Sequence, residues 1–490
     1  MKKLLLAASI FLLLAAASCG REAQEGNNNE YIHEYIHAPQ QEYEPPQEAP
    51  PQEYEPQESP PAEYTPLILP QFSVPMDVAE RYFSQAQALF DEDGGALWGF
   101  PFHVPIIIAD PTTRHAAANR PDPEGFFACY GGVDFGVLPE DFSLFAVVTV
   151  IHDFGGERWV VVPLDTVMRS SLAERRRHIA HYAMHWHQHC PDFFGGVIGF
   201  ANTHMNEKQA RISIRLEINA LIGAFRATGE ARRNTVIDAL SIRAARRQQF
   251  DSAVDENRLE TLEGLAQFTE WAMTTTSQAQ LLGLMEGFTN SVRYAGLERM
   301  FGYLSGAMYA FLLKETDKAW TENLTIDTDL GQLLKEAMGI DELRPLNEVN
   351  LTRYGYTEIA AEEYVWAATQ AALLAQITTL FIDNPTLQLH EEDIGETRAS
   401  ISGHFFTVAI PNFNSIWQGD IEIVGSFGQL NVRNGHVVSH GFLYDRFLMV
   451  TAQGLEVDGS RISGNTWTMT LNEGYMLLPD GDNFRIVREL

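Results

Sequence analysis

The sequence contains few cysteines and few basic residues. It has 3 cysteines in 490 residues, and 34 lysines and arginines stand against 65 aspartates and glutamates, so the formal net charge is −31. Such an acidic chain is not attracted to nucleic acid or to anionic lipid headgroups, and both are disfavoured as partners. If Cys19 belongs to a processing signal, as argued below, one candidate disulfide is left, between Cys129 and Cys190.

Several common functional motifs are also absent. The sequence has no Walker-type phosphate loop, no dinucleotide-binding glycine fingerprint and no G-x-S-x-G elbow. The acidic stretch DEDGG (91–95) lacks the remaining ligands of a calcium loop. The chemistry indicated by the sequence must therefore come from other polar residues, among which the histidines stand out.

The first residues have the layout of a secretory signal. Two lysines precede an apolar run from Leu4 to Ala17, which is too short for a comfortable membrane span. Small residues lead directly into Cys19 and Gly20, as in a bacterial lipoprotein signal. We predict a signal peptide at 1–18, a lipidated Cys19 as membrane anchor and an extracytoplasmic location. An ordinary signal that is cleaved nearby is the alternative.

A proline-rich acidic segment follows the predicted signal. Residues 19–66 repeat the unit QEYEP and carry many glutamates. Proline stiffness and charge repulsion disfavour a packed core, so this segment is predicted to be a disordered tether.

The rest of the chain changes its hydrophobic period twice. Short β-branched runs at 104–110, 145–151 and 158–164 indicate strands, and helical spacing dominates from 171 to 384, in segments such as 209–229, 232–250, 257–273 and 357–381. Alternation returns after residue 400. We therefore predict an α+β protein, with a mostly helical domain at 67–395 whose N-terminal part contains strands, and a small all-β module at 396–490.

One segment, HIAHYAMHWHQH (178–189), holds five of the 15 histidines. On a helix, His178, His181, His185 and His189 fall on one face because they are three or four residues apart. His181 and His185 have the i, i+4 separation with which two imidazoles bind one zinc ion in the HExxH motif. The residue after the first histidine is the general base of that motif, and here it is Tyr182.

A zinc site of this kind needs a third ligand from another helix. The best candidate is Glu263 in LETLEGLAQFTE, and Glu260 lies one turn earlier on a similar face.

Several segments, taken in order, resemble a known family. They are VVVPLD, HIAHYAMHWHQH, NTHMNEKQARISIRLEINALIGAF, ENRLETLEGLAQFTEWA and FGYLSGAMYAFLLK. Together they resemble an uncharacterised bacterial branch of gluzincin-type zinc metallopeptidases, whose helices carry HExFHRxQ, LRLEWRAL, ExxEGLAxY and GxLY patterns. The resemblance spans roughly residues 75 to 490.

This resemblance implies a zincin-like fold for the helical domain and a zinc ion bound by His181, His185 and Glu263, with Gln188 in the place of the family's glutamine. The chain departs from the pattern at Tyr182, where the base is missing, at Trp186, where the family has arginine, and at 204–206, where HLD has become HMN. A tyrosine is a poor base near neutral pH because its ordinary pKa is about 10.

Three functions stay open. The first is a surface lipoprotein with a degenerate peptidase domain that binds a peptide or protein ligand in its cleft. The second is an active, atypical zinc hydrolase in which another residue near the metal acts as the base or stabilises the oxyanion; the candidates are Glu260, His178, Tyr182, Tyr303 and Tyr309. The third is a metal-binding lipoprotein that uses the whole His178–His189 face.

Overall fold

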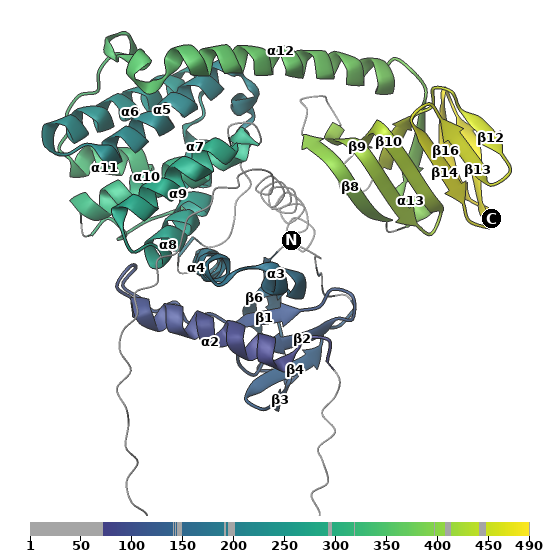
Figure 1. Ribbon diagram of the computed structural model, residues 1–490, viewed down its shortest axis with the longest axis horizontal. Coiled ribbons are helices and arrows are strands. Elements are labelled where there is room, and N and C mark those ends of the chain that lie inside the picture. Colours follow the sequence, from purple (N-terminus) through teal and green to yellow (C-terminus); the bar gives the residue numbers. More distant parts are fainter. Residues whose placement is uncertain are drawn as a thin grey trace, which may run out of the picture.

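The computed structural model describes residues 72–489 except 141, 143, 145–148, 191–192, 195–200, 293–295, 318, 396, 407–412 and 441–446. The predicted signal and tether at 1–66 lie outside the described residues. Figure 1 shows a helical body, a small sheet with helix α2 on one side of it, and a second sheet reached through the long helix α12. This arrangement confirms the α+β fold class.

The N-terminal layer pairs one helix with six strands. It consists of α2 (Met76–Asp93), β1 (Ile106–Ala109), β2 (His115–Ala118), β3 (Ala128–Tyr130), β4 (Val133–Val137), β5 (Val150–Phe154) and β6 (Glu157–Pro163). The strand order is β3-β4-β2-β1-β6-β5, in which only the β1/β6 pair of these strands is parallel.

Alternation along the central strands builds two cores. Ile106 and Ile108 of β1 face the large core shared with the helices, whereas Ile107 packs with Trp159 and Val161 in a smaller core on the other face. Successive strand residues point to opposite faces, so strands covered on both sides become apolar throughout. For this reason the sequence shows β1 and β6 as continuous apolar runs.

The helical body carries the histidine segment. Its elements are α3 (Leu164–Arg169), α4 (Leu172–Gln188), η1 (Thr203–Asn206), α5 (Lys208–Arg226), α6 (Gly229–Phe250), α7 (Ala253–Leu259), the π-helix η2 (Glu260–Gly264), α8 (Leu265–Thr274), α9 (Gln278–Val292), α10 (Leu297–Thr316), α11 (Leu330–Ala337), η3 (Leu346–Glu348) and η4 (Leu351–Tyr354). The expected helices at 209–229 and 232–250 correspond to α5 and α6.

A cluster of buried charges ties α5, α6 and α7 together. Arg246 donates to Glu256, with distances of 2.9 and 2.7 Å from Nε and Nη2 to the carboxylate oxygens, and it also donates to Glu217. Arg247 Nε donates to Glu256 at 2.8 Å, and the histidine of the HMN segment, His204, contacts the same carboxylate. Glu217 and Glu256 are fully buried. Such charges persist in a core only when each is paired, so the three elements must keep their mutual positions.

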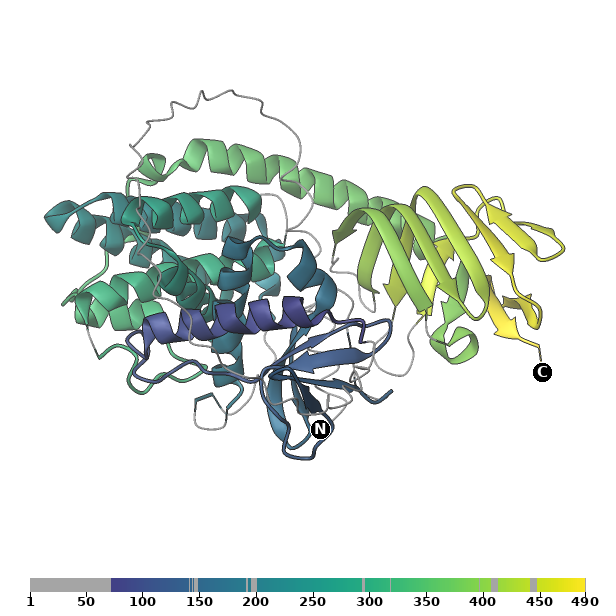
Figure 2. The same cartoon turned by 60° about the horizontal axis from the view of Figure 1, so that its bottom comes forward.

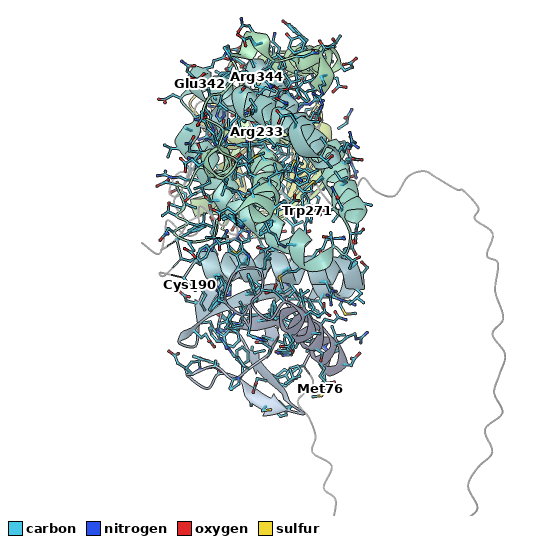
Figure 3. The ribbon with its side chains drawn as sticks, turned by 90° about the vertical axis from the view of Figure 1, so that its left-hand side faces the viewer. Met76, Cys190, Arg233, Trp271, Glu342 and Arg344 are labelled. Atoms are coloured by element: carbon cyan, nitrogen blue, oxygen red, sulfur yellow. The ribbon has the colours of Figure 1, made fainter. Side chains whose placement is uncertain are left out.

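At the end of the body farthest from Met76, two arginines fasten a loop (Figure 3). Arg233 donates to the carbonyls of Met338 and Gly339, and Arg344 donates to Asp238. The segment after α11 is thereby held against α6.

The C-terminal sheet contains ten strands among the described residues. They are β7 (Thr386–His390), β8 (Thr397–Phe406), β9 (Phe413–Gly425), β10 (Gly428–His440), β11 (Phe447–Thr451), β12 (Glu456–Asp458), β13 (Arg461–Gly464), β14 (Trp467–Leu471), β15 (Tyr475–Asp480) and β16 (Asn483–Arg488), with the short helix α13 (Glu391–Ile394) after β7. One edge of β10 pairs with β9, and its other edge pairs first with β14 and then with β11. The sheet therefore divides along β10 and curls (Figure 2).

Helix α12 (Tyr356–Phe381) belongs to both parts of the molecule. Near its start, buried Glu363 accepts from Arg211 and Arg215 of α5. Near its end, Ile377 and Phe381 pack in an apolar cluster with residues of β9, β10 and β11. The helix is therefore anchored by charge at one end and by apolar contact at the other.

Three details of the described residues bear on the sequence predictions. β7 precedes residue 396 but belongs to the C-terminal sheet, because it pairs with β11 and β16, and the short helix α13 follows it directly. The boundary between the two domains therefore lies before β7 rather than at 396. Cys129 and Cys190 are not bonded to each other. No described helix has both the length and the apolar character needed to cross a bilayer.

Replacing Glu256 with glutamine is expected to lower the free energy of unfolding by about 3–5 kcal/mol, because it leaves Arg246 and Arg247 with uncompensated buried charge. The matched control is Glu286→Gln, in which a 41% exposed carboxylate loses its pairing with Arg226, for an expected cost of about 0–1 kcal/mol. Denaturant titration of both variants measures the difference. Equal losses would contradict the structural role given to the cluster.

In Glu256→Gln, the free energy of unfolding should also depend less strongly on pH in the acid range. Burial raises the pKa of Glu256, but Arg246, His204 and Arg247 outweigh it and hold that pKa well below its ordinary value. As the pH falls below about 4.3, the unfolded chain takes up a proton at Glu256 before the folded chain does, so the free energy of unfolding decreases. Unfolding curves between about pH 5 and pH 3 should show a smaller decrease for Glu256→Gln than for the unaltered chain.

Candidate metal centre

The histidine helix α4 begins at a complete capping box. The Ser171 hydroxyl accepts from the Glu174 backbone N–H at 3.3 Å, and the Glu174 carboxylate accepts from the Ser171 N–H at 2.7 Å. These two bonds satisfy backbone donors that the first turn leaves free. Because the capping box fixes where the helix begins, it also fixes which direction the face with His181 and His185 points.

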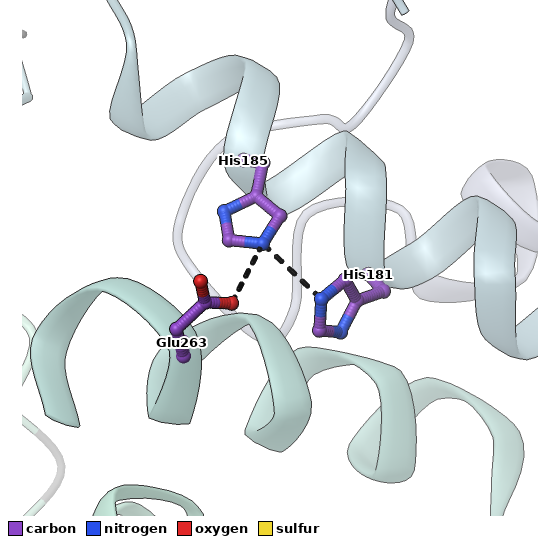
Figure 4. Close-up of side chains that lie close together, drawn as sticks. All are labelled: His181, His185 and Glu263. Atoms are coloured by element: carbon purple, nitrogen blue, oxygen red, sulfur yellow. Dashed lines mark hydrogen bonds and ion pairs between the residues drawn. The ribbon is translucent and has the colours of Figure 1, made fainter. Parts of the chain in front are cut away.

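Three side chains from two elements meet beside this helix (Figure 4). His181 Nε2 lies 3.1 Å from His185 Nε2, and His185 Nε2 lies 3.3 Å from Glu263 Oε2. One ligand atom of each residue lies within 4.8 Å of the other two. The exposed fractions of the three residues are 9%, 6% and 1%. The structure thus brings together the three residues expected to bind metal.

Gln188 fixes the tautomer of His185. Its side-chain amide donates to the carbonyls of Thr261 and Leu262, at 3.0 and 2.8 Å, so its oxygen faces His185 Nδ1 at 2.7 Å. An amide oxygen can only accept, and the proton must therefore be on Nδ1. Nε2 of His185 is left with its lone pair directed at His181 and Glu263.

His181 has a carboxylate behind it. Its Nδ1 lies 3.3 Å from Glu270 Oε2 without forming a hydrogen bond, and the negative charge of that carboxylate favours the proton on Nδ1. Its Nε2 lone pair then faces the same point as that of His185. A carboxylate or amide behind each imidazole is the arrangement that orients histidine ligands in metal sites.

Glu263 is ionised and only partly satisfied. Burial raises its pKa, but the charge of the Arg299 guanidinium holds that pKa well below its ordinary value. Arg299 donates to Oε1. Oε2, which faces the histidines, is a buried oxygen with no hydrogen-bond donor in the described part of the chain.

With the protons of both histidines on Nδ1, two imidazole lone pairs and one carboxylate oxygen converge, an arrangement that a bound cation satisfies. For a tetrahedral zinc ion with bonds of about 2.0–2.1 Å, neighbouring ligand atoms lie about 3.3 Å apart. The two separations that involve His185, 3.1 and 3.3 Å, agree with this value, and the ligand atoms of His181 and Glu263 lie within 4.8 Å of each other. The residues fit a transition-metal ion with two nitrogen ligands and one oxygen ligand.

The π-helix η2 points two glutamates in different directions. On an α-helix, residues three positions apart lie within about 60° of each other, because each residue turns by about 100°. A π turn holds more residues, so the same pair diverges further. Within η2, Glu263 faces the histidines, whereas Glu260 accepts from Arg243 at 2.6 Å and from Ser305 at 2.6 Å, in the buried charge cluster.

Glycines bring the backbone of η2 against α10. A Cβ atom on Gly306 would lie 2.5 Å from the Glu260 carbonyl oxygen, and one on Gly264 would lie 2.6 Å from the Gly302 oxygen. Real Cβ contacts are never this short, so these positions require glycine. The contact holds η2 from one side while Gln188 binds its carbonyls from the other.

Two tyrosines expected near the metal do lie at the site. The ring of Tyr303 is stacked on His181 with centroids 5.9 Å apart, and the Tyr182 ring lies 5.4 and 5.8 Å from those of His181 and His185. Burial raises the pKa of Tyr182, and the charge of Glu263 raises it further. Burial and then Glu263 also raise the pKa of Tyr303. Neither phenol is disposed to lose a proton.

Two other candidates belong to a different part of the core. Glu260 is held by Arg243 and Ser305, as described above, and Tyr309 donates to Glu217 at 2.7 Å. Both residues are components of the buried charge cluster. This corrects the expectation that Glu260 could act as the base and Tyr309 as an oxyanion donor, because their polar groups already have other partners.

The outer histidines are not part of the triad. His178 contacts Thr149 Oγ1 at 3.0 Å, and burial, with the charge of His181, lowers its pKa to about 3. His189 donates to the His185 carbonyl at 2.8 Å from the C-cap of α4, and burial lowers its pKa to about 4. Among the described residues, the group able to hold a metal contains neither. The metal-binding hypothesis that uses the whole His178–His189 face therefore needs ligands that lie outside the triad.

The chain matches no protein-family model, and neither the curated proteins nor the solved structures include a significant match. The resemblance to gluzincin-type metallopeptidases therefore stays a prediction that depends on motif order.

Sequence reasoning missed Glu270 and Arg299. Glu270 lies seven residues after Glu263, a separation of two helical turns that places both on one face, so this signal was available. Arg299 comes from α10, and no local pattern connects it to the site.

Gly306→Ala should destabilise the fold by about 1–3 kcal/mol or more, because the new methyl group forces the two backbones apart. Gly283→Ala is the matched control: it lies in α9, a Cβ there meets nothing within 4 Å, and alanine should be neutral or stabilising by up to about 1 kcal/mol. Thermal unfolding of both variants tests this contrast. If the variants have the same midpoint, the glycine contact does not hold η2.

Proposed function

We propose that this protein is a lipid-anchored, extracytoplasmic protein whose helical core binds one divalent metal ion through His181, His185 and Glu263. In this proposal the core is a zincin-like domain without the usual general base. It binds a peptide or protein ligand rather than hydrolysing it. The anchor is Cys19, and support for it comes from the signal-like first residues.

The observation that carries the metal proposal is the buried Glu263 Oε2, which has no donor among the described residues and faces two imidazole lone pairs. Zinc is the first choice because two histidines and one glutamate are a frequent ligand set for it. Arg299 engages Oε1, so Glu263 offers one oxygen only. Three protein ligands leave one coordination position open, and a bound metal would supply a Lewis acid there.

The loss of hydrolysis is argued from what surrounds the triad. Tyr182 occupies the position of the base, and its pKa is raised by burial and by Glu263. Glu270, the other carboxylate in contact with the triad, faces the outer nitrogen of His181. Without a base to accept a proton from water, a factor on the order of 10² to 10⁴ in rate is lost. Tyr303 beside His181 keeps the active-hydrolase alternative open as a second candidate.

The purified full chain should contain about one zinc ion per molecule by elemental mass spectrometry. His185→Ala should abolish this binding because it removes a central ligand. His189→Ala is the matched control on the same helix and should retain the metal. Several ions per chain, or loss of metal in both variants, would favour the scavenging histidine face, and no metal in the unaltered chain would refute the proposal.

Tyr182→Glu restores the carboxylate of the HExxH pattern beside the two ligands. With metal bound, this variant should hydrolyse a mixed peptide library faster than Tyr182→Gln by a factor on the order of 10² to 10⁴. Tyr182→Gln has similar size and no basic group, so it controls for the removal of the aromatic ring. Hydrolysis by the unaltered chain at the level of Tyr182→Glu would instead establish an active enzyme.

A further inference from the structure

Strand β8 forms an edge of the C-terminal sheet. It pairs with β9 over its whole length, from Thr397 opposite Gly425 to Phe406 opposite Ile416, without a register shift. In the described part of the chain no other strand pairs with β8, and Figure 1 shows it at the margin of the sheet. About half of the backbone N–H and C=O groups of such a strand point away from the sheet and are available to a further strand.

The two other edges among the described strands are blocked, whereas β8 is not. β12 has three residues, and β15 contains Pro479, which has no N–H to offer a further strand. By contrast, β8 is ten residues long, contains no proline and has Arg398 near its start as its one charged residue. Native sheets commonly block an edge with a short strand, proline, charges or a bulge. The sequence of β8 therefore favours pairing with another strand.

The first half of β8 leaves room for such a strand. Ala399 and Ser400 follow each other in the strand and therefore point to opposite faces of the sheet, and both are exposed. The described residues thus cover neither face of the edge at this point. Ala399 lies opposite Ile423, which is fully buried in the core of the sheet. An apolar side chain on an added strand would extend this face.

On the Ser400 face, an open cavity of about 270 Å³ lies beside the edge. Its lining comes from three neighbouring strands, with Ser400 and Ser402 of β8, residues 420–422 of β9 and residues 431–433 of β10. Ser400 lies directly opposite Glu422 in the ladder. The cavity therefore begins at the edge strand, where side chains of an added strand would enter it.

The cavity carries a negative charge that no described cation balances. Asp420 lies 3.6 Å from Arg433, but Glu422 accepts a hydrogen bond from the neutral amide of Gln429 and forms no ion pair with a described residue. A residue opposite Ser400 on an added strand would be two strand spacings, about 10 Å, from Glu422. A lysine or arginine has the length to cross the small Ser400 and the charge to pair with Glu422.

This charge distinguishes among the strands that could occupy the edge. In two antiparallel copies of β8, Arg398 lies opposite Ser400 only when residues 397–401 alone overlap, which leaves half of each strand unpaired. The segment at 19–66 has Arg21 as its one arginine, contains no lysine and is rich in proline and glutamate. Both occupants fit the edge poorly, so a basic segment of another molecule fits it best.

We propose that β8 binds an extended segment of a peptide or partner protein as an additional strand, and that a lysine or arginine of this segment pairs with Glu422. The segment has alternating character, with polar or basic residues on the Ser400 face and apolar residues on the Ala399 face. Main-chain hydrogen bonds supply the affinity, and the alternate side chains supply the selectivity. This inference concerns the C-terminal sheet and does not depend on the metal site.

The test uses the full chain and the probe fluorescein-Val-Thr-Val-Lys-Val-Thr-Val-Ser-amide, with binding measured by fluorescence anisotropy. The probe should bind in a saturable manner, and the same peptide with glutamate in place of lysine should bind at least about tenfold more weakly. Glu422→Lys should reverse this preference. Glu456→Lys, on the far edge strand β12, makes the same change in net charge and should leave the preference unchanged.

Methylation of single backbone nitrogens in the probe tests whether it binds as a strand. Neighbouring N–H groups of a strand point in opposite directions, so only one of the lysine and the valine after it can donate to β8. One of the two N-methyl peptides should therefore bind at least about tenfold more weakly than the other. Equal binding of these two peptides would show that no strand is added.

Other results would also overturn the proposal. These are no saturable binding of the lysine probe, an unchanged preference in Glu422→Lys, or a dimer in sedimentation velocity that excludes the probe, which would give the edge to a second copy. Binding should persist in EDTA, and its loss there would place the peptide at the metal instead. Because zinc content is measured separately, failure of the metal site leaves this test intact.

Discussion

The contact between η2 and α10 is the constraint on which both charged clusters of this protein depend. Two backbones can touch there because Gly264 and Gly306 present no side chain. The π-helix meets two requirements at once. Glu260 must balance the charge of buried arginines, and Glu263 must reach the histidines. A regular α-helix would point both carboxylates toward nearly the same side. The core charge balance and the candidate site are therefore set by one local irregularity.

The side chains of the candidate site are held in fixed orientations although they come from three different helical elements. His185 comes from α4, Glu263 from η2 and Arg299 from α10, and Gln188 links the first two by binding backbone carbonyls that belong to the π segment. Because the amide bonds to the backbone rather than to the Glu263 side chain, it orients the imidazole without competing for the ion. At Glu263 the side chain itself is contacted: Arg299 binds one carboxylate oxygen and leaves the other available to an ion.

Much of the helical body could be predicted from the sequence because its signals are local. The expected helix at 357–381 agrees with α12 to within one residue, and the pairing of His181 with His185 followed from helical spacing alone. The choice between Glu260 and Glu263 could not follow from spacing, because the π turn that separates them depends on a glycine contact with a helix about 40 residues away. Arg299 was missed for the same reason.

The C-terminal boundary shows a related limit. A short strand such as β7 has no sequence signal that tells whether it pairs forward or backward, and its partners β11 and β16 lie 60 to 100 residues later. The alternating pattern after residue 400 therefore identified the sheet but not its first strand. Pairing with strands far along the chain determines which sheet β7 joins, as it commonly does for strands.

Helix α12 has a mechanical consequence. Since Glu363 is clamped by Arg211 and Arg215 while Ile377 and Phe381 are embedded in the cluster at β9, β10 and β11, the connection between the two bodies contains no slack peptide. A pull on the C-terminal sheet would be transmitted along the helix axis to α5, which runs beside the buried arginines of α6. The C-terminal sheet is thus coupled to the helical body through a rigid helix rather than through a flexible linker.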